Sequence, residues 1–241
     1  MKLLKFIYTV YSVTIFVILM LILSLFIVLP MLFSENGDKI SFYFIRLWAG
    51  TWFFLTGIRY EVYGLDHIDK SSPYIYIFNH RSFLDAPIIP LSIPQELRAL
   101  GKKELSKIPV FGYVVGNFAI WVDRTSTDSR RTSVEKLVKL LEKGKSVVVA
   151  PEGTRNNTNE TLLPFQKGAF RLSVETGISI LPMAVIGAGK IMKRGSLLIS
   201  PGKVKIYFSP AMNPPKPSET AVAEFTEKVK SRLEAMILTN E

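Results

Sequence analysis

The residues best suited to chemistry are a histidine and an aspartate that lie five positions apart after an apolar segment. Residues 74–78 read YIYIF and run directly into His80 and Asp85. If the chain turns into a helix there, the carboxylate can return to one imidazole nitrogen and stabilise the imidazolium that forms on proton abstraction. No cysteine and no G-x-S-x-G elbow supplies a nucleophile, so the pair predicts a general base for a substrate hydroxyl. On spacing alone, Asp85 as a helix N-cap beside a surface histidine stays open as the alternative.

A second polar group follows a second apolar segment. Residues 146–150 read SVVVA and lead into 151–155, which read PEGTR. Arg155 is suited to hold a phosphate through two parallel hydrogen bonds. Glu152 could hold a hydroxyl or position Arg155, and Gly153 gives the backbone freedom to turn. An ion pair that caps a turn is the plainer interpretation of the same residues.

Three further residues are weaker candidates. Lys103 and Arg124 border a central basic stretch and could join Arg155 around an anionic head group. Taken singly, each is equally explained as a solvated surface charge. Pro182 interrupts the apolar segment 180–185, which predicts an edge strand or a wall against which a ligand lies.

The elements that must position these residues alternate between strand and helix patterns. Apolar, β-branched and aromatic segments predict short strands at residues 60–63, 74–78, 118–122, 146–150 and 180–185. Helical patterns cover residues 104–117, 129–143 and 218–238, and residues 197–200 and 203–208 read as a late hairpin around Pro201-Gly202. This alternation predicts an α/β fold with a mixed sheet flanked by helices.

The first part of the chain has a different composition. Of the first 60 residues, 40 are apolar, and the uncharged run 6–29 would form about 36 Å of helix against a hydrocarbon core of about 30 Å. A polar turn separates it from a second apolar run at 40–58. We therefore expect residues 1–58 to form a membrane-associated helical hairpin, and residues 59–241 to form the α/β domain. Basic residues flank the hairpin on both sides, so a hairpin that spans twice or dips into one leaflet keeps both flanks in the cytoplasm.

Composition also excludes several classes of site. The chain has 241 residues, a net charge of +10, no cysteine and two histidines. Disulfides, thiolate metal sites and iron–sulfur clusters are therefore excluded, and two histidines leave little room for a histidine metal cluster, so we expect no metal. The aromatic residues gather in the apolar front rather than among the basic residues, which argues against a nucleic-acid partner.

Four short blocks occur in an order that resembles a known family. They are Asn79-His80 with Asp85, a basic stretch that ends at Arg124, the PEGTR segment 151–155, and the Ile-Leu-Pro segment around Pro182. Together with the apolar front, they resemble the glycerolipid acyltransferase family, and most of all its 1-acyl-glycerol-3-phosphate acyltransferases. The four blocks span residues 79–185, and four in order are specific where each alone is not.

The resemblance implies a role for each matching residue. His80 would deprotonate the free hydroxyl of lysophosphatidic acid, with Asp85 orienting the ring, and the hydroxyl would attack an acyl thioester directly to give phosphatidic acid. Arg155 would bind the phosphate with help from Lys103 and, more weakly, Arg124. The substrate-binding set implied in this way is Lys103, Arg124, Glu152, Gly153, Thr154, Arg155 and Pro182, with Pro182 on the acyl-donor side.

The resemblance also implies partners and a location. The acyl donor would be acyl-coenzyme A or acyl carrier protein as co-substrate, with no bound cofactor. The chain would lie on the phospholipid bilayer, with its catalytic domain at the cytoplasmic face of the inner or plasma membrane. Acylation of glycerol-3-phosphate or of another lysophospholipid remains an alternative, as does a catalytically inactive, membrane-anchored lipid-binding protein.

Overall fold

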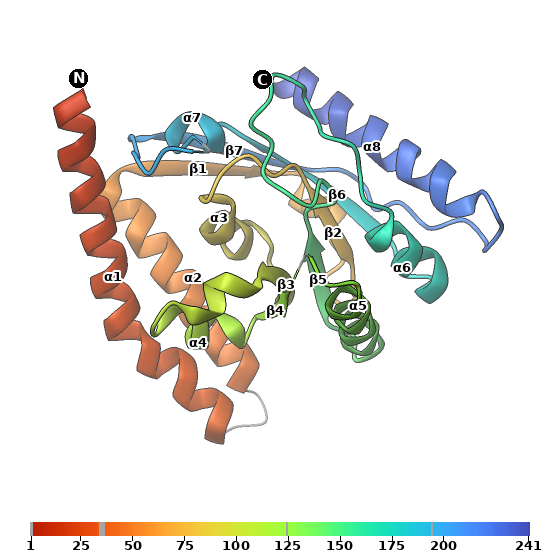
Figure 1. Ribbon diagram of the computed structural model, residues 1–241, viewed down its shortest axis with the longest axis horizontal. Helices are drawn as coiled ribbons and strands as arrows, with labels where there is room; N and C mark the ends of the chain where they lie inside the picture. Colours follow the sequence, from red (N-terminus) through yellow and green to blue (C-terminus); the bar gives the residue numbers. More distant parts are fainter. Residues whose placement is uncertain (1, 34–36, 124, 194) are drawn as a thin grey trace.

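A seven-stranded mixed sheet with helices on both faces forms the centre of the molecule (Figure 1). The computed structural model describes residues 2–33, 37–123, 125–193 and 195–241, without the side chain of Arg130. The strands are β1 (Ile58–Tyr63), β2 (Ile75–Phe78), β3 (Leu97–Lys102), β4 (Ala119–Val122), β5 (Ser146–Val149), β6 (Ile180–Ile186) and β7 (Gly202–Phe208). The α-helices are α1 (Lys2–Phe33), α2 (Gly37–Thr56), α3 (Asp85–Ser92), α4 (Phe111–Gly116), α5 (Thr127–Glu142), α6 (Gly168–Thr176), α7 (Ala188–Ile191) and α8 (Ala221–Asn240). The short 3₁₀ helices are η1 (Leu65–His67) and η2 (Lys103–Lys107).

The sheet brings the ends of neighbouring parallel strands to one edge. Its order is β1-β7-β6-β2-β5-β3-β4, and the five strands from β6 to β4 run parallel. Strand β7 is antiparallel to β6 and parallel to β1. Because β2 and β5 are parallel neighbours, the polar segments that follow them leave the sheet side by side. The mixed α/β fold expected from the sequence is confirmed.

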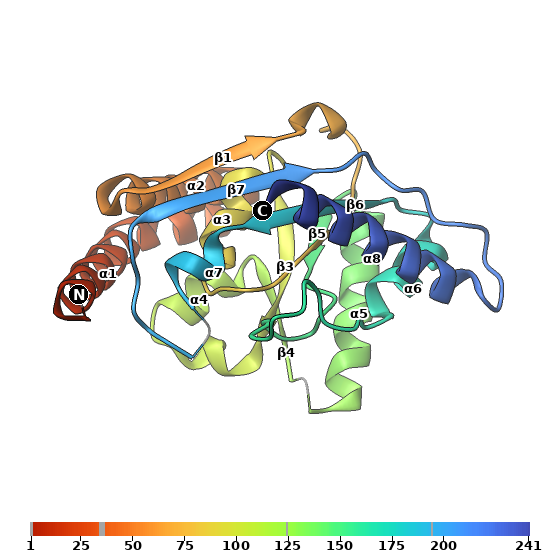
Figure 2. The same cartoon turned by 90° about the horizontal axis from the view of Figure 1, so that it is seen from above.

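Each face of the sheet has its own hydrophobic core. On β2, Tyr76 and Phe78 join the cluster that includes α2, α3 and α7, while Ile75 and Ile77 join the cluster under α5, α6 and α8. Figure 2 shows these two helical layers on either side of the strands. With both faces covered, the central strands are apolar throughout rather than alternating, which is typical of parallel sheets.

The two N-terminal helices pack against each other, as the two apolar runs predicted. The indole N–H of Trp52 donates to the carbonyl of Ser12 at 2.8 Å, and that of Trp48 donates to the carbonyl of Phe16 at 3.2 Å. On another side of α2, Phe42 and Phe53 are buried in the same cluster as the sheet. Helix α2 therefore packs both on α1 and on the α/β fold. Within the described residues, α1 is the one helix that is long and apolar enough to cross a membrane, judged by length and composition.

Two local predictions are wrong, and one strand was not indicated by the sequence. Residues 197–200 form no strand, because both sides of β7 are already paired with β1 and β6, and the segment is held instead by α1, where Thr9 accepts the backbone N–H of Ile199 at 2.9 Å. The helix expected at 104–117 divides into η2 and α4 around Pro109, which cannot donate a backbone hydrogen bond. Strand β3 was not predicted, since its sequence LRALGK has none of the β-branched or aromatic residues typical of strands.

Candidate active site

The loop after β2 holds His80 close to Asp85. The side chain of Asn79 first ties this loop to β6: its amide donates to the carbonyl of Val185 at 2.9 Å, and its carbonyl accepts the N–H of Val185 at 2.7 Å. The chain then turns, and α3 begins at Asp85. His80 Nδ1 lies 2.6 Å from Asp85 Oδ2. The return of the carboxylate to the imidazole that the spacing predicted is present in the structure.

Backbone groups fix the Asp85 carboxylate in place. The side chain is 1% exposed, and Oδ2 also accepts the backbone N–H groups of Arg81 and Ser82, each at 3.1 Å. The aspartate thus binds the loop amides and the imidazole at once, whereas the helix N-cap is Leu84, so the alternative of Asp85 as an N-cap is wrong. A carboxylate beside Nδ1 favours the tautomer with its proton on that nitrogen, and this leaves Nε2 to take a proton. His80 is 23% exposed, so the ring reaches the surface of the site.

Glu152 supports the loop from the neighbouring strand end. One carboxylate oxygen accepts the backbone N–H of His80 at 2.8 Å, and the other accepts that of Leu163 at 2.9 Å. Burial raises the pKa of Glu152, and these two amide hydrogen bonds oppose that shift. Of the two roles considered from the sequence, positioning and hydroxyl binding, the contacts favour positioning, and the groups that the carboxylate holds are the backbone amides of His80 and Leu163.

Arg155 lies against the loop that carries His80. Its guanidinium carbon is 3.4 Å from the centre of the Phe83 ring, which is a cation–π contact between the two strand-end loops. The turn that leads to it requires Gly153, whose φ of +68° is a conformation that side chains disfavour. Thr154 between them is exposed. The PEGTR segment and the histidine loop therefore form one site.

Two residues of the site, Arg81 and Asn156, were not predicted from the sequence. They join the loop after β2 to the segment that follows Arg155. The guanidinium of Arg81 donates to the carbonyl of Glu160 at 2.5 Å and to that of Thr161 at 3.1 Å. The backbone N–H of Asn156 donates to the carbonyl of His80 at 2.6 Å. No spacing rule reveals these partners, because each contact joins segments about 75 residues apart. Their only sequence signal is their position, since Arg81 directly follows His80 and Asn156 directly follows Arg155.

The weaker candidates have different outcomes. Lys103 is 59% exposed at the end of β3, and its Nζ lies 3.5 Å from Asp123 Oδ2. Arg124 lies outside the described residues. Pro182 is buried in β6, an interior strand, so the expectation of an edge is wrong. Its missing N–H is tolerated because the ladder between β6 and β7 begins one residue later, at Met183.

Comparison with known proteins places these loops in a family context. Residues 59–186, which include the whole site, match the family described as Acyltransferase. The chain is 31% identical over 179 residues to a protein named 1-acyl-sn-glycerol-3-phosphate acyltransferase BAT2, chloroplastic, from Brassica napus, and 30% identical over 198 residues to LPAT1, chloroplastic, of the same activity name, from Arabidopsis thaliana. These alignments cover 73% and 81% of this chain, but 51% and 54% of the plant proteins, so the chain spans about half their length.

Two bacterial proteins match over most of their length. A Borreliella burgdorferi protein named 1-acyl-sn-glycerol-3-phosphate acyltransferase is 28% identical over 196 residues, which is 81% of this chain and 78% of that protein. The crystal structure of PlsC, the 1-acyl-sn-glycerophosphate acyltransferase of Thermotoga maritima, superposes with a TM-score of 0.83 at 24% identity, covering 100% of this chain and 98% of that one. The structural match extends to the N-terminal helix pair and establishes the fold.

Proposed function

The chain belongs to the acyltransferase family, and we propose that it transfers a fatty acyl group from an acyl thioester to the free hydroxyl of lysophosphatidic acid, giving phosphatidic acid. The observation that carries the proposal is the 2.6 Å contact between His80 Nδ1 and Asp85 Oδ2 at the end of β2. The activity named for the relatives above supports the choice of substrate.

The proposed reaction is direct transfer without an acyl-enzyme. His80 Nε2 removes the proton of the acceptor hydroxyl as its oxygen attacks the thioester carbonyl carbon. A C–O bond forms, the C–S bond breaks, and the imidazolium returns the proton to the leaving thiolate, which departs as a thiol. Asp85 stabilises the imidazolium between these two transfers. Glu152 acts as a positioning residue, because both of its oxygens bind backbone amides.

Arg155 is the proposed ligand of the phosphate. Stacking on Phe83 uses the flat face of the guanidinium, whereas its N–H groups lie in the plane, in the fork that matches phosphate oxygens. Gly153 and Thr154 shape the turn beside it. Lys103, at the end of β3 on the same edge of the sheet, adds positive charge, and we assign Arg124 and Pro182 to substrate binding only through the family resemblance.

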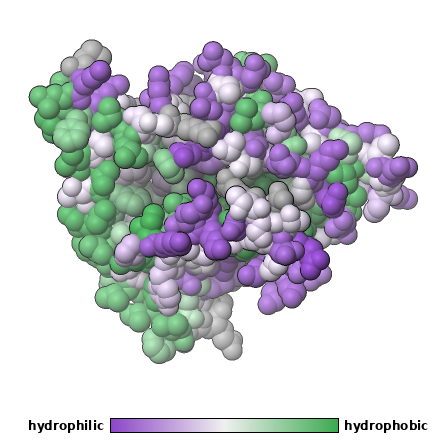
Figure 3. Space-filling model, in the orientation of Figure 1, coloured by the Kyte–Doolittle hydropathy of each residue, from purple (hydrophilic) through white to green (hydrophobic). Residues whose placement is uncertain are grey.

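We further propose that residues 1–58 seat the α/β part, residues 59–241, on a bilayer, with the site at its cytoplasmic face. Figure 3 shows a continuous apolar surface over α1 along one side of the molecule. Leu21 and Leu25 of this surface are 52% and 62% exposed. A patch of this kind marks an interaction surface. At that location a lysolipid reaches His80 without leaving the membrane, and a positive face attracts anionic lipids and the anionic donors acyl-coenzyme A or acyl carrier protein.

Vesicle flotation tests the membrane seat. Replacing both Leu21 and Leu25 with Glu should weaken binding to anionic vesicles at least tenfold, because each buried leucine contributes about 1.5–3 kcal/mol. Leu238→Glu is the matched control, since that leucine is 63% exposed on α8, away from α1. Equal flotation of the double variant and the wild type would contradict the proposed seat.

Product analysis tests the reaction. The purified protein in vesicles is offered lysophosphatidic acid, glycerol-3-phosphate or lysophosphatidylcholine, each with acyl-coenzyme A or acyl carrier protein, and products are identified by mass spectrometry. We expect phosphatidic acid as the main product. Faster acylation of another acceptor would assign the site to that acceptor, and no product with any pair would favour a lipid-binding protein without activity.

A further inference from the structure

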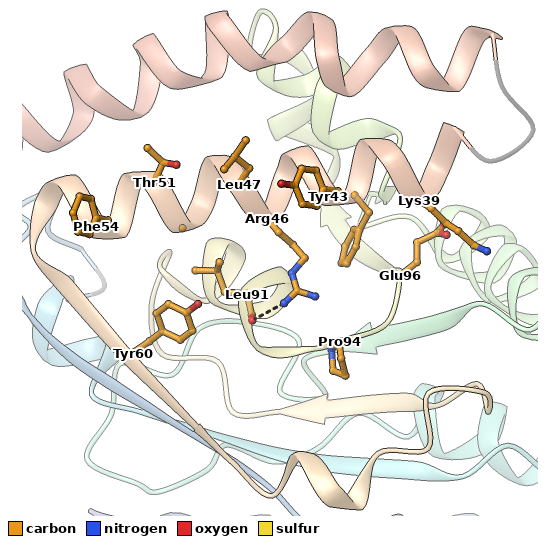
Figure 4. A pocket seen from close by; sticks show the side chains of 12 residues that line it. Lys39, Tyr43, Arg46, Leu47, Thr51, Phe54, Tyr60, Leu91, Pro94 and Glu96 are labelled. Atoms are coloured by element: carbon orange, nitrogen blue, oxygen red, sulfur yellow. Dashed lines mark hydrogen bonds between the residues drawn. The ribbon is translucent and has the colours of Figure 1, made fainter.

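A second hollow, distant from His80, opens at the other end of α3 (Figure 4). It is a groove of about 830 Å³ between α2, the start of β1 and the segment that follows α3. Helix α3 begins at Asp85 and ends at Ser92, so the groove beside Leu91 lies about one helix length, roughly 12 Å, from the catalytic pair. The proposed acyl transfer does not use it.

Apolar side chains line the groove and face outward. On α2, Tyr43, Leu47 and Phe54 lie along one stripe and are 62%, 41% and 83% exposed; Tyr60 of β1, 38% exposed, forms the opposite wall (Figure 4). Gly50 lies on the same stripe and leaves the floor open down to Leu91. Exposure of such an apolar surface to water is unfavourable. Helix α2 also lies next to α1, whose exposed face is apolar.

Two cations lie on the same stripe. Lys39 and Arg46 line the groove, and within the described residues neither has a carboxylate within 4.0 Å. Arg46 donates only long hydrogen bonds, of 3.5 and 3.4 Å, to the carbonyls of Leu91 and Ile93. The acidic residue at the rim, Glu96, is already bound by Arg98 and Lys145, each at 2.9 Å. The groove is therefore positively charged at one end and apolar at the other.

We propose that this groove binds one anionic phospholipid of the bilayer, separate from the lipid that is acylated. Lys39 and Arg46 bind its phosphate, and one acyl chain lies along Leu47 to Phe54. From Arg46 to Phe54 the helix rises about 12 Å, close to the roughly 15 Å that a chain spans in half of the hydrocarbon core. Tyr43, on the same side of the groove as the two cations, is an amphipathic aromatic of the kind expected at the membrane–water interface (Figure 4). The inference rests on the proposed membrane seat but not on the acyl transfer.

Photo-crosslinking tests the site. The full chain is bound to phosphatidylcholine vesicles that contain a trace of phosphatidylglycerol with a diazirine in one acyl chain, and labelled peptides are mapped by mass spectrometry. We expect label on α2 between residues 43 and 54 and on residues 91–94, at least tenfold above that from an equally labelled phosphatidylcholine. Label on the outer face of α1 reports the membrane seat separately, and no step requires acyl transfer.

Three variants decide the outcome. Gly50→Leu fills the floor, where the first added carbon would lie 3.5 Å from Leu91 Cδ2 in ordinary contact, and should lower groove labelling at least tenfold. Ala235→Leu adds the same side chain on the exposed face of α8, away from the groove and from α1, and should leave groove labelling unchanged. Replacing both Lys39 and Arg46 with Gln should abolish the preference for the anionic probe, which keeps the test independent of whether Gly50→Leu folds.

Several results would overturn the inference. One is groove labelling that neither Gly50→Leu nor the double Gln variant changes. Another is labelling of α1 alone. A third is loss of groove labelling when lysophosphatidic acid is added at saturation. The last result would assign the groove to the substrate's own chain instead of a bilayer lipid.

Discussion

The two ends of helix α3 differ in almost every physical respect. At its first residue, a carboxylate that is 1% exposed holds the His80 ring at 2.6 Å and two backbone amides at 3.1 Å. At its last turn, the carbonyl of Leu91 has only a long contact of 3.5 Å with Arg46, beside a groove whose aromatic walls are exposed. One short helix therefore joins a rigid polar site to an open apolar one.

The difference follows from what each end is proposed to do. Proton transfer and acyl attack require the reacting atoms to be held within a fraction of an ångström, which short, fully buried hydrogen bonds achieve. A lipid chain has many conformations and needs apolar area rather than fixed distances. The comparison predicts that substitutions at the polar end change the rate of reaction, whereas those at the apolar end change lipid contacts.

The largest effect is expected at Asp85. In Asp85→Asn, the amide cannot stabilise the imidazolium, so kcat should fall by about 10²–10⁴. Groove labelling by the phosphatidylglycerol probe should be unchanged, since α3 keeps its packing. Steady-state kinetics measures the loss of kcat, and crosslinking on the same preparation measures groove labelling. A kcat near that of the wild type would contradict the proposed difference between the two ends of α3.

Arg155 connects the polar end to the substrate. Arg155→Ala should lower kcat/KM for lysophosphatidic acid by about 10–100-fold more than for monoacylglycerol, because hydrogen bonds to a charged group contribute about 1.5–3 kcal/mol. Arg155→Lys keeps the charge but not the planar fork. Its kcat/KM for lysophosphatidic acid should therefore lie between the values for the wild type and for Arg155→Ala. Equal losses on both acceptors would remove Arg155 from phosphate binding.

Glu152 should affect folding as well as rate. Glu152→Gln replaces one of the two accepting oxygens with an N–H₂ group that faces a backbone N–H, which should lower the free energy of unfolding by about 1–3 kcal/mol. Urea unfolding in detergent measures this loss. Glu160→Gln, on the exposed part of the same loop, is the control and should leave stability unchanged.

The smallest effect is a pH dependence at the same residue. Since burial raises the pKa of Glu152, the folded state binds a proton there more tightly than the unfolded chain does. This contribution to stability is complete below the ordinary glutamate pKa of about 4.3 and is lost as pH rises through the raised value. Relative to Glu152→Gln, the wild type should therefore gain stability on acidification, and a relative loss would contradict the assignment.

The parts that could be predicted from sequence are those in which the partners are close along the chain. His80 and Asp85 are five positions apart, so their spacing allowed the carboxylate to reach the imidazole, and the family resemblance favoured this interpretation over a helix N-cap. The strand-end positions of His80 and Arg155 followed in the same way, because parallel strands end at one edge. The buried apolar strands β2 and β5 were recognisable from composition alone.

Contacts between distant segments could not be predicted. Glu152 binds the backbone of His80 across 72 residues, and a backbone amide has no sequence signature. The pairing of β7 with β1 and β6, and the groove between α2, β1 and the segment after α3, depend on how distant elements pack. The pairing of Arg98 in β3 could not be predicted either. This arginine is 8% exposed and is paired with Glu96, and a charged residue is unexpected in a buried strand, so the sequence of β3 did not indicate a strand.

The central claim is that His80 is the general base, and the chain contains its own control in His67. That histidine also lies near an aspartate, with Nδ1 3.8 Å from Asp66 Oδ2, but it belongs to the short helix η1 between β1 and β2 and not to the loops that follow β2 and β5. The decisive measurement is the rate of phosphatidic acid formation in vesicles by the wild type, His80→Ala and His67→Ala, read by mass spectrometry. We predict a loss of at least a hundredfold for His80→Ala and an unchanged rate for His67→Ala, whereas a wild-type rate in His80→Ala would contradict the claim.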